Sequence, residues 1–327
     1  MTSKAKRMKS YAINLAAIAA LYAVMVLLIN VGVINDYWQG IFIMVFINII
    51  LATSLNLATG FLGQLALGHA GFMAVGAYAA AIFSKAVTMP PLVELISSLF
   101  VGGIVAAIFG IIIGVPALRL KGDYLAIITL GFGEIIRVII ENLKITGGAQ
   151  GLIGIERHTN IYNVFIIALI IVALLYALIR SRHGRAIISI REDEIAAEAS
   201  GIPTTYYKIL GFTLAAFIAG IAGGLYAHYM GNLGAKYFDF NQSINILVIV
   251  VLGGLGSFTG SIVAAIVLTL LPELLRGLAD KRMLVYSIVL ILMMIFKPSG
   301  LFGQYEFSLT RTIDKAFGRH QKGGVKQ

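Results

Sequence analysis

The chain contains no cysteine and few charged residues. Without cysteine, disulfide bonds, thiol catalysis and cysteine-ligated metal sites are excluded. Charged residues make up 12% of the 327 residues, against roughly 25% in soluble domains, whereas 59% are hydrophobic. This composition excludes a soluble domain of this length and indicates a protein that crosses a membrane several times.

Several sequence motifs of enzymes are also missing. The chain has no G-x-x-x-x-G-K-[ST] motif for ATP phosphates, no H-E-x-x-H zinc motif and no G-x-S-x-G nucleophile turn. The glycine-rich stretch 146–154 lacks the lysine and hydroxyl of a phosphate-binding loop, and we expect it to be a flexible loop outside the membrane. No catalytic residue, metal site or cofactor is therefore expected.

The apolar runs predict an all-α polytopic membrane protein. A transmembrane helix needs about 20 mostly apolar residues, and runs of this kind recur along the chain. Residues 244–275 are ambiguous, since they fit either one bent helix or two elements that meet at 253–257. The other predicted spans are 11–33, 38–59, 60–83, 92–118, 124–143, 161–179, 209–230 and the short 284–296.

Charge counting separates the two alternatives, because cytoplasmic segments of membrane proteins carry an excess of Lys and Arg. Ten membrane elements place 17 Lys and Arg inside and 7 outside, whereas nine elements give 14 and 10. We therefore predict about ten transmembrane or re-entrant helices with both termini cytoplasmic. The predicted parts are a basic segment 1–10, a membrane domain 11–296 and a basic tail 297–327. The same rule accounts for the net charge of +10, so no nucleic-acid partner is expected.

Small residues predict close helix contacts and an internal repeat. Two rows recur at helical spacing, which lets helix backbones approach closely: Ala70, Ala74, Ala77 and Ala81 in one, and Ala216, Gly220 and Gly224 in the other. The sequences GFLGQ at 60–64 and GGLGS at 253–257 share a pattern of glycines, leucine and a polar residue. This echo suggests a duplicated core whose two copies have the same orientation.

The longest charged passage, 180–208, must lie in water, and we place it in the cytoplasm. It holds 5 of the 25 Lys and Arg and 4 of the 15 acidic residues. Ser189 and Glu192 have the spacing of a capping box, and the acids at 192–194 suit the first turn of a helix. Gly201 and Pro203 would end that helix, so we predict it over 192–201.

A helix this short is marginal alone in water, so we expect it to dock in a groove of a partner protein. The residues of the predicted docking surface are Arg191, Glu192, Asp193, Glu194, Ile195, Glu198 and Gly201. The alternative is an amphipathic loop that rests on the membrane surface. A basic face would be expected there, and the acidic residues argue against it.

Polar residues inside the spans are candidates for a translocation pathway. Glu134 would lie about 15 Å into a helix that starts near Tyr124, so it should face protein or a cavity. Arg137 and Glu141 share its helix face, and the two interpretations are a gate residue and a structural ion pair. The remaining candidates are Asn56, Gln64 and His69, which could instead form hydrogen bonds between helices, while His228 is expected at the membrane interface.

Four stretches of the chain resemble one family of transport proteins. They are SLNLATGFLGQLALGHAGFMAVGAYAAA (54–81), RLKGDYLAIITLGFGEIIRVIIENLKITGGAQGLIGI (119–155), GRAIISIREDEIAAEASGI (184–202) and VVLGGLGSFTGSIVAA (250–265). These stretches together resemble the permease subunit of prokaryotic branched-chain amino-acid ABC importers, and within that family the LivM type. The resemblance therefore implies an ABC importer permease fold in the prokaryotic plasma (inner) membrane.

The resemblance also implies partners and a mechanism. The partners would be a second permease in a heterodimer, two cytoplasmic ATPase subunits that bind ATP, and an external solute-binding protein that delivers an amino acid. Residues 192–201 would be the coupling helix, although only Glu198, Ala199 and Gly201 echo the motif of other ABC permeases. Transport would proceed by alternating access, with Asn56, Gln64, His69 and Glu134 as candidate pathway residues.

Three alternatives remain open at this point. The chain could be an ABC permease for another small solute, such as urea, an amide or a sugar. It could also be an autonomous secondary transporter driven by an ion gradient, although no pair of intramembrane carboxylates of the kind used in proton relays is evident. A membrane scaffold without transport would leave the polar and glycine-rich spans superfluous.

Overall fold

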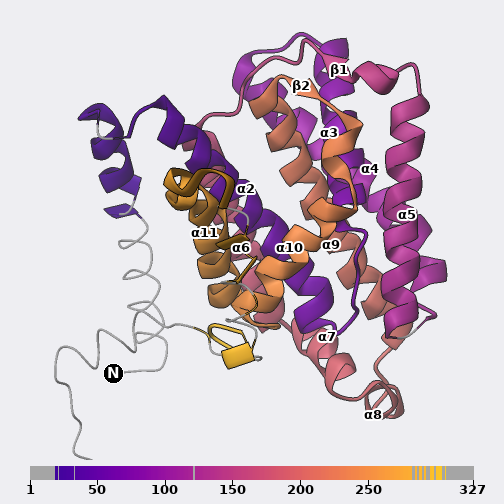
Figure 1. Ribbon diagram of the computed structural model, residues 1–327. Helices are drawn as coiled ribbons and strands as arrows, with labels where there is room; N and C mark the ends of the chain where they lie inside the picture. Colours follow the sequence, from indigo (N-terminus) through magenta and orange to yellow (C-terminus); the bar gives the residue numbers. More distant parts are fainter. Residues whose placement is uncertain are drawn as a thin grey trace, which may run out of the picture. The chain divides into compact units, whose positions relative to one another are not determined.

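The structure is a computed structural model of the chain (Figure 1). It describes residues 19–281 except 21, 33 and 121, and beyond them residues 284, 285, 287, 288, 291, 295–297, 300–303 and 306. Residues 40–305 form one compact unit, and residues 1–39 and 306–327 belong to a second. The predicted segment 1–10 lies outside the described residues, as do many residues of the predicted spans 11–33 and 284–296 and most of the tail 297–327.

Helices form most of the described chain, as the apolar runs predict. The α-helices are α2 (Asp36–Asn56), α3 (His69–Ala86), α4 (Pro91–Ala117), α5 (Asp123–Asn142), α6 (Ile161–Arg180), α7 (Arg182–Glu192), α8 (Glu194–Ala199), α9 (Thr204–Met230), α10 (Phe240–Gly253) and α11 (Phe258–Leu274). Shorter helical turns are η1 (Leu57–Phe61), η2 (Gly148–Gln150), η3 (Ala235–Phe238) and η4 (Leu275–Lys281). Residues 22–30 are also helical.

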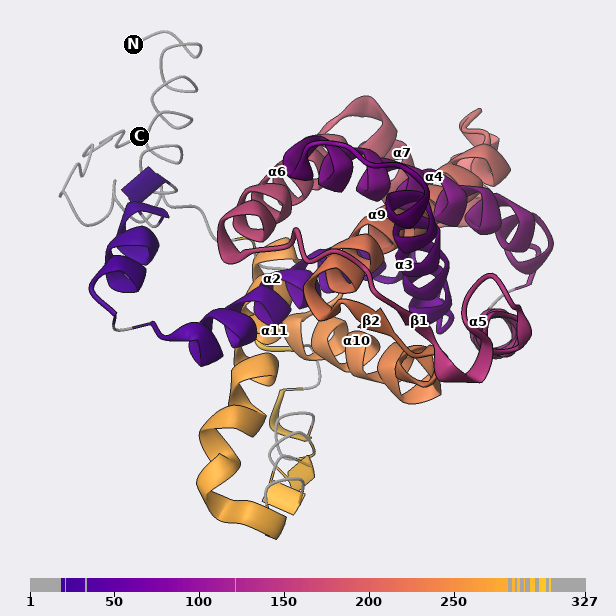
Figure 2. The ribbon, with the colours of Figure 1, turned by 90° about the horizontal axis from the view of Figure 1, so that it is seen from above.

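Among the described residues, five helices are long and apolar enough to cross a membrane. They cover Asp36–Phe61, Pro91–Ala117, Ile161–Arg180, Thr204–Met230 and Phe258–Gly277. The predicted spans 38–59, 92–118, 161–179 and 209–230 correspond to four of them. Within the unit 40–305, α5 and α11 lie toward different edges of the bundle (Figure 2).

The helices α3, α4 and α9 pack closely because small residues line their contacts. A Cβ at Gly76 would lie 2.2 Å from the Cα of Gly220, so only glycine allows the two backbones to meet. A Cβ at Gly223 would lie 2.0 Å from the carbonyl oxygen of Met73. Both predicted small-residue rows are buried, which confirms them as contact surfaces.

The two glycine motifs interrupt helices and lie side by side. The helix α2 ends in the π-helical turn η1, and α3 begins only at His69, so the predicted span 60–83 is wrong at its start. Gly254 and Gly256 have φ values of +114° and +85°, which end α10 and make 244–275 two helices. Asn56 Oδ1 accepts a hydrogen bond from the backbone N–H of Gly256 at 2.9 Å, which joins the two interruptions.

The end of the unit opposite α7 and α8 carries a short β-ladder (Figure 1). Strand β1 (Leu152–Ile153) pairs antiparallel with β2 (Asn232–Leu233). The prediction that 146–154 is a flexible loop is therefore wrong, because η2 and β1 give this stretch regular hydrogen-bonded structure.

Candidate coupling surface and polar sites

The charged passage 180–208 folds into two short helices and the first turn of α9. Ser181 caps α7, since its hydroxyl oxygen accepts a hydrogen bond from the N–H of Gly184 at 3.3 Å. The apolar residues Ile187 and Ile190 of α7 are buried. This burial holds α7 helical past Ser189, whose hydroxyl donates to the carbonyl of Ala186, so the predicted Ser189 cap is wrong.

The helix α8 is shorter than predicted and is capped by Asp193. One carboxylate oxygen of Asp193 accepts hydrogen bonds from the N–H groups of Ile195 at 2.9 Å and Ala196 at 3.0 Å. The predicted stop is confirmed, because Gly201 takes a φ of +81° and its N–H donates to the carbonyl of Glu198. The helix therefore begins at Glu194 and not at Glu192.

The outer side of α8 combines one apolar side chain with acids. Ile195 is 78% exposed, which is unusual for a large aliphatic residue on an ordered helix. Glu192, Asp193 and Glu198 are exposed near it, as is Gly201. Glu194 instead turns toward α9, where its Oε1 pairs with Nζ of the buried Lys208 at 2.6 Å. This ion pair fixes the start of α8 against the membrane helix.

Arg191 points into the unit and not away from it. It belongs to α7, and its Nη1 donates to the carbonyl oxygen of Gly60 at 2.9 Å. Its guanidinium also pairs with Glu192. A Cβ at Gly256 would lie 2.8 Å from Arg191 Nη1. Arg191 therefore does not share a helix with Glu194 and Glu198, although all three belong to the predicted docking surface, and its guanidinium reaches the place where the two glycine motifs meet.

Glu134 lies in a half-buried row of charges on α5. Arg137 Nε is 2.8 Å from Glu134 Oε2, and Arg137 Nη1 is 3.0 Å from Glu141 Oε2. The predicted pairing of these three residues is confirmed. One guanidinium thus neutralises part of the charge of two carboxylates, and the role of Glu134 in a pathway stays a prediction.

The other candidate pathway residues contact different neighbours. Asn56 is fully buried, and its Nδ2 donates to the carbonyl of Ser257 at 2.9 Å and to the hydroxyl of Ser261 at 2.8 Å. His69 Nε2 is 2.8 Å from the hydroxyl of Ser54, while Gln64 is half-buried in the segment 62–68. The contacts of Asn56 and His69 suit hydrogen bonding between helices, and a pathway role for any of them stays a prediction.

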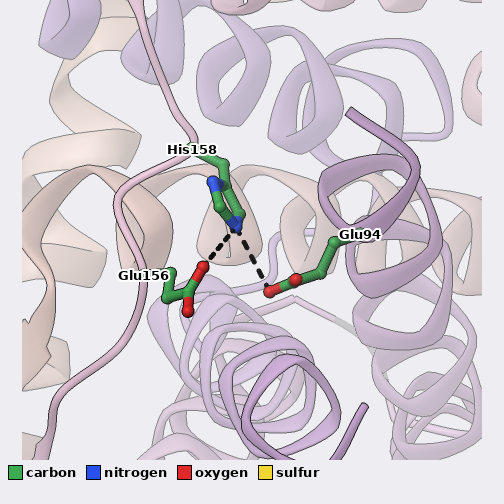
Figure 3. Close-up of side chains that lie close together, drawn as sticks. All are labelled: Glu94, Glu156 and His158. Atoms are coloured by element: carbon green, nitrogen blue, oxygen red, sulfur yellow. Dashed lines mark ion pairs between the residues drawn. The ribbon is translucent and has the colours of Figure 1, made fainter. Parts of the chain in front are cut away.

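Sequence reasoning missed a buried polar cluster near the β-ladder. His228, predicted at the membrane interface, is fully buried, and hydrogen bonds join it to the hydroxyl of Ser98 and the carbonyl of Glu156, both at 2.9 Å. Its ring stacks on that of His158, which lies between Glu94 and Glu156 (Figure 3). These residues come from distant parts of the chain, so no local sequence pattern predicts that they form a cluster.

Comparison with known proteins assigns the chain to a family. The family described as branched-chain amino acid transport system / permease component matches residues 37–297. The chain belongs to this permease family. No solved structure matches the permease.

Named relatives agree with this assignment. The permease is 37% identical over 293 residues to the high-affinity branched-chain amino acid transport system permease protein LivM of Salmonella typhimurium, covering 79% of this chain and 68% of the relative. With LivM of Escherichia coli it shares 37% identity over 290 residues, covering 78% and 67%. With LivH of Escherichia coli it shares 30% over 128 residues, covering 38% and 41%.

The family and the apolar helices together show where the permease is located in the cell. It is a multi-pass protein of the prokaryotic plasma membrane, and it is a transport subunit.

Proposed function

We propose that the permease is the transmembrane subunit of an ATP-driven importer for branched-chain, aliphatic amino acids and forms half of the translocation pathway. The identity with two proteins named LivM supports this substrate class. The weaker similarity to LivH supports a heterodimer with a second permease of related fold. Two separate cytoplasmic ATPase subunits would bind the ATP, and an external solute-binding protein would deliver the amino acid.

The proposed topology has about ten membrane elements with both termini cytoplasmic and an internal parallel repeat. The segment 1–10 and the tail 297–327 would lie in the cytoplasm, and 11–296 would form the membrane domain with the coupling loop 180–208. The separation of α10 from α11 supports the count. The interruption of helices by both glycine motifs supports the repeat.

The observation that carries the proposal is the exposed side of α8. An apolar side chain surrounded by acids, on a helix fixed at both ends, suits a protein groove that is apolar at its floor and basic at its rim. A membrane surface would favour a basic helix. The helix α8 would therefore be the coupling helix, seated in an ATPase subunit.

Arg191 supports a route from the coupling helix into the membrane domain. Closure of the ATPases would move α8, and the hydrogen bond from Arg191 to Gly60 would carry that movement to the segment between α2 and α3. The cavity between the two permeases would then open outward and inward in turn. Asn56, Gln64, His69 and Glu134 are the proposed residues of this pathway.

The proposal is tested by purifying the complex through a tag on this chain and reconstituting it in proteoliposomes with ATP. We expect co-purification of two ATPases and a second permease, and ATP-dependent uptake of leucine when the binding protein is added. Uptake of urea or a sugar in place of leucine would show that the proposed substrate class is wrong. Uptake by this chain alone, driven by an ion gradient, would overturn the proposal.

Docking of α8 is tested by Ile195→Asp. An added charge in an apolar groove should remove the ATPase subunits from the purified complex without preventing membrane insertion. The matched control is Ile153→Asp, since Ile153 is 64% exposed on β1 at the other end of the unit. Equal loss of the ATPases in both variants, or retention in both, would contradict docking through α8.

A further inference from the structure

Three potential metal ligands meet near the β-ladder (Figure 3). Glu94 belongs to the first turn of α4, while Glu156 and His158 follow β1 in the connection to α6. His158 Nε2 lies 3.3 Å from Glu94 Oε1 and 3.2 Å from Glu156 Oε2. The structure therefore brings one imidazole nitrogen and two carboxylate oxygens together from two separate parts of the chain.

The imidazole nitrogen has no hydrogen bond to any residue that the structure describes. The His158 side chain is only 10% exposed, and Nε2 itself is buried. The oxygens of Glu94 and Glu156 lie at ion-pair distance from it. A buried nitrogen that faces two carboxylates without a well-formed hydrogen bond to either is unusual, because buried polar groups nearly always form one.

The spacing of the three donor atoms suits a tetrahedral metal ion. Zinc binds imidazole nitrogen and carboxylate oxygen at about 2.0–2.2 Å, so neighbouring ligands of a tetrahedral site are roughly 3.3–3.5 Å apart. The two distances from His158 Nε2 are close to this value, and all three donor atoms lie within 4.8 Å of one another. One nitrogen and two oxygens are also a ligand set that zinc and related divalent ions accept.

Neighbouring residues hold two of the ligands in place. The hydroxyl of Ser84 donates to Glu94 Oε1 at 2.5 Å. The His158 ring stacks on His228, with centroids 5.6 Å apart, and His228 is itself held by Ser98 and the Glu156 carbonyl. Hydrogen bonds such as that from Ser84 to Glu94 orient metal ligands and raise affinity. The Glu156 side chain is 72% exposed, which leaves a route for an ion from solvent.

We propose that Glu94, Glu156 and His158 bind a divalent transition-metal ion of the zinc class, with water in the fourth position. The ion would join the start of α4 to the connection between β1 and α6, on the face that the proposed topology places outside the cell. The site is separate from α8 at the opposite end of the unit (Figure 1), so it does not depend on the proposed coupling.

The proposal is tested on the full chain, purified with a tag that contains no histidine and freed of metal with a chelator. Titration with Zn²⁺, followed by calorimetry and by elemental analysis after desalting, should give one ion per chain. Absorption of Co²⁺ should show the intense visible bands of a tetrahedral site. Zn²⁺ should also raise the thermal unfolding temperature.

Two variants and one control decide the outcome. Glu156→Gln changes an exposed carboxylate, so it should fold and yet lower the zinc affinity by about tenfold or more. His158→Gln should abolish binding. His183→Gln is the control, because His183 is exposed on α7, and it should bind zinc as the unaltered chain does. No zinc retained by the unaltered chain, or equal zinc in all variants, would overturn the site and leave an ion pair between His158 and the two glutamates.

Discussion

Arg191 Nη1 donates a hydrogen bond to the carbonyl oxygen of Gly60, 131 residues earlier in the chain, at 2.9 Å. This contact joins the last turn of α7 to the π-helical turn η1 that follows α2. It is charge-assisted and only partly exposed to solvent, so it persists better than a surface ion pair. The proposed movement of α8 therefore has a specific route to the interrupted helices.

The first prediction concerns this contact. Arg191→Ala should lower stability by about 1–2 kcal/mol through the lost charge-assisted hydrogen bond. It should also lower the amount of leucine transported per ATP hydrolysed, because α7 no longer holds Gly60. The measurement is uptake and phosphate release in the same proteoliposomes. Arg185→Ala is the control, since Arg185 is exposed on α7 and its guanidinium donates to the neighbouring Arg180 carbonyl and not to Gly60. Equal coupling ratios in the two variants would contradict the route.

The second prediction concerns the ion pair between Glu194 and Lys208. Glu194→Gln leaves the buried Lys208 ammonium without a counter-charge and should cost up to about 3 kcal/mol. Lys208→Met in the same chain should recover much of that loss, because no buried charge remains. Thermal unfolding and protease cleavage within 192–202 would measure the effect. A double variant no more stable than Glu194→Gln would show that the pair does not fix α8.

The third prediction concerns Asn56. Asn56→Leu removes two hydrogen bonds to the segment before α11 and one to Ser261 within α11, and it should lower stability by about 2–4 kcal/mol. Asn48→Leu on the same helix removes one hydrogen bond, to Thr269, and should cost about 1 kcal/mol. Thermal unfolding in detergent compares them. If Asn56→Leu raised the KM for leucine while unfolding normally, the proposed pathway role of Asn56 would be supported and a purely bridging role would be contradicted.

The fourth prediction concerns Glu134. Glu134→Gln should slow leucine uptake while lowering stability by only about 1 kcal/mol or less, because Arg137 still pairs with Glu141. Glu141→Gln is the matched control, since it removes the other partner of the same guanidinium. Uptake and thermal unfolding are measured for both. If both variants lose the same stability and transport normally, Glu134 serves as a structural ion pair.

Local sequence patterns correctly predicted the structural features that depend on residues close together in the chain. The small-residue rows follow from helical spacing, and the stop after α8 follows from Gly201 and Pro203. Residues 244–275 fit one helix or two, charge counting favours two, and the positive φ of Gly254 and Gly256 ends α10 at this point. In each case the backbone conformation depends on residues within a few positions.

Contacts between residues distant in the chain explain why some predictions from the sequence were wrong. Ser189 has the spacing of a capping residue, but burial of Ile187 and Ile190 keeps that position inside a helix. His228 lies near the end of an apolar helix, yet Ser98, 130 residues away, and Glu156, 72 residues away, bind it in the interior. Arg191 is likewise turned inward by a carbonyl from another helix. A local sequence pattern cannot predict these contacts, because the partner residues are distant in the chain.

The close contact among α3, α4 and α9 bears on how the permease can move. Where backbone meets backbone, as at Gly76 and Gly220, there is no side chain that could change its rotamer to accommodate sliding. We therefore expect these three helices to rotate as one rigid body during transport. The bending would then fall on the segments 62–68 and 254–257, where positive-φ glycines act as hinges.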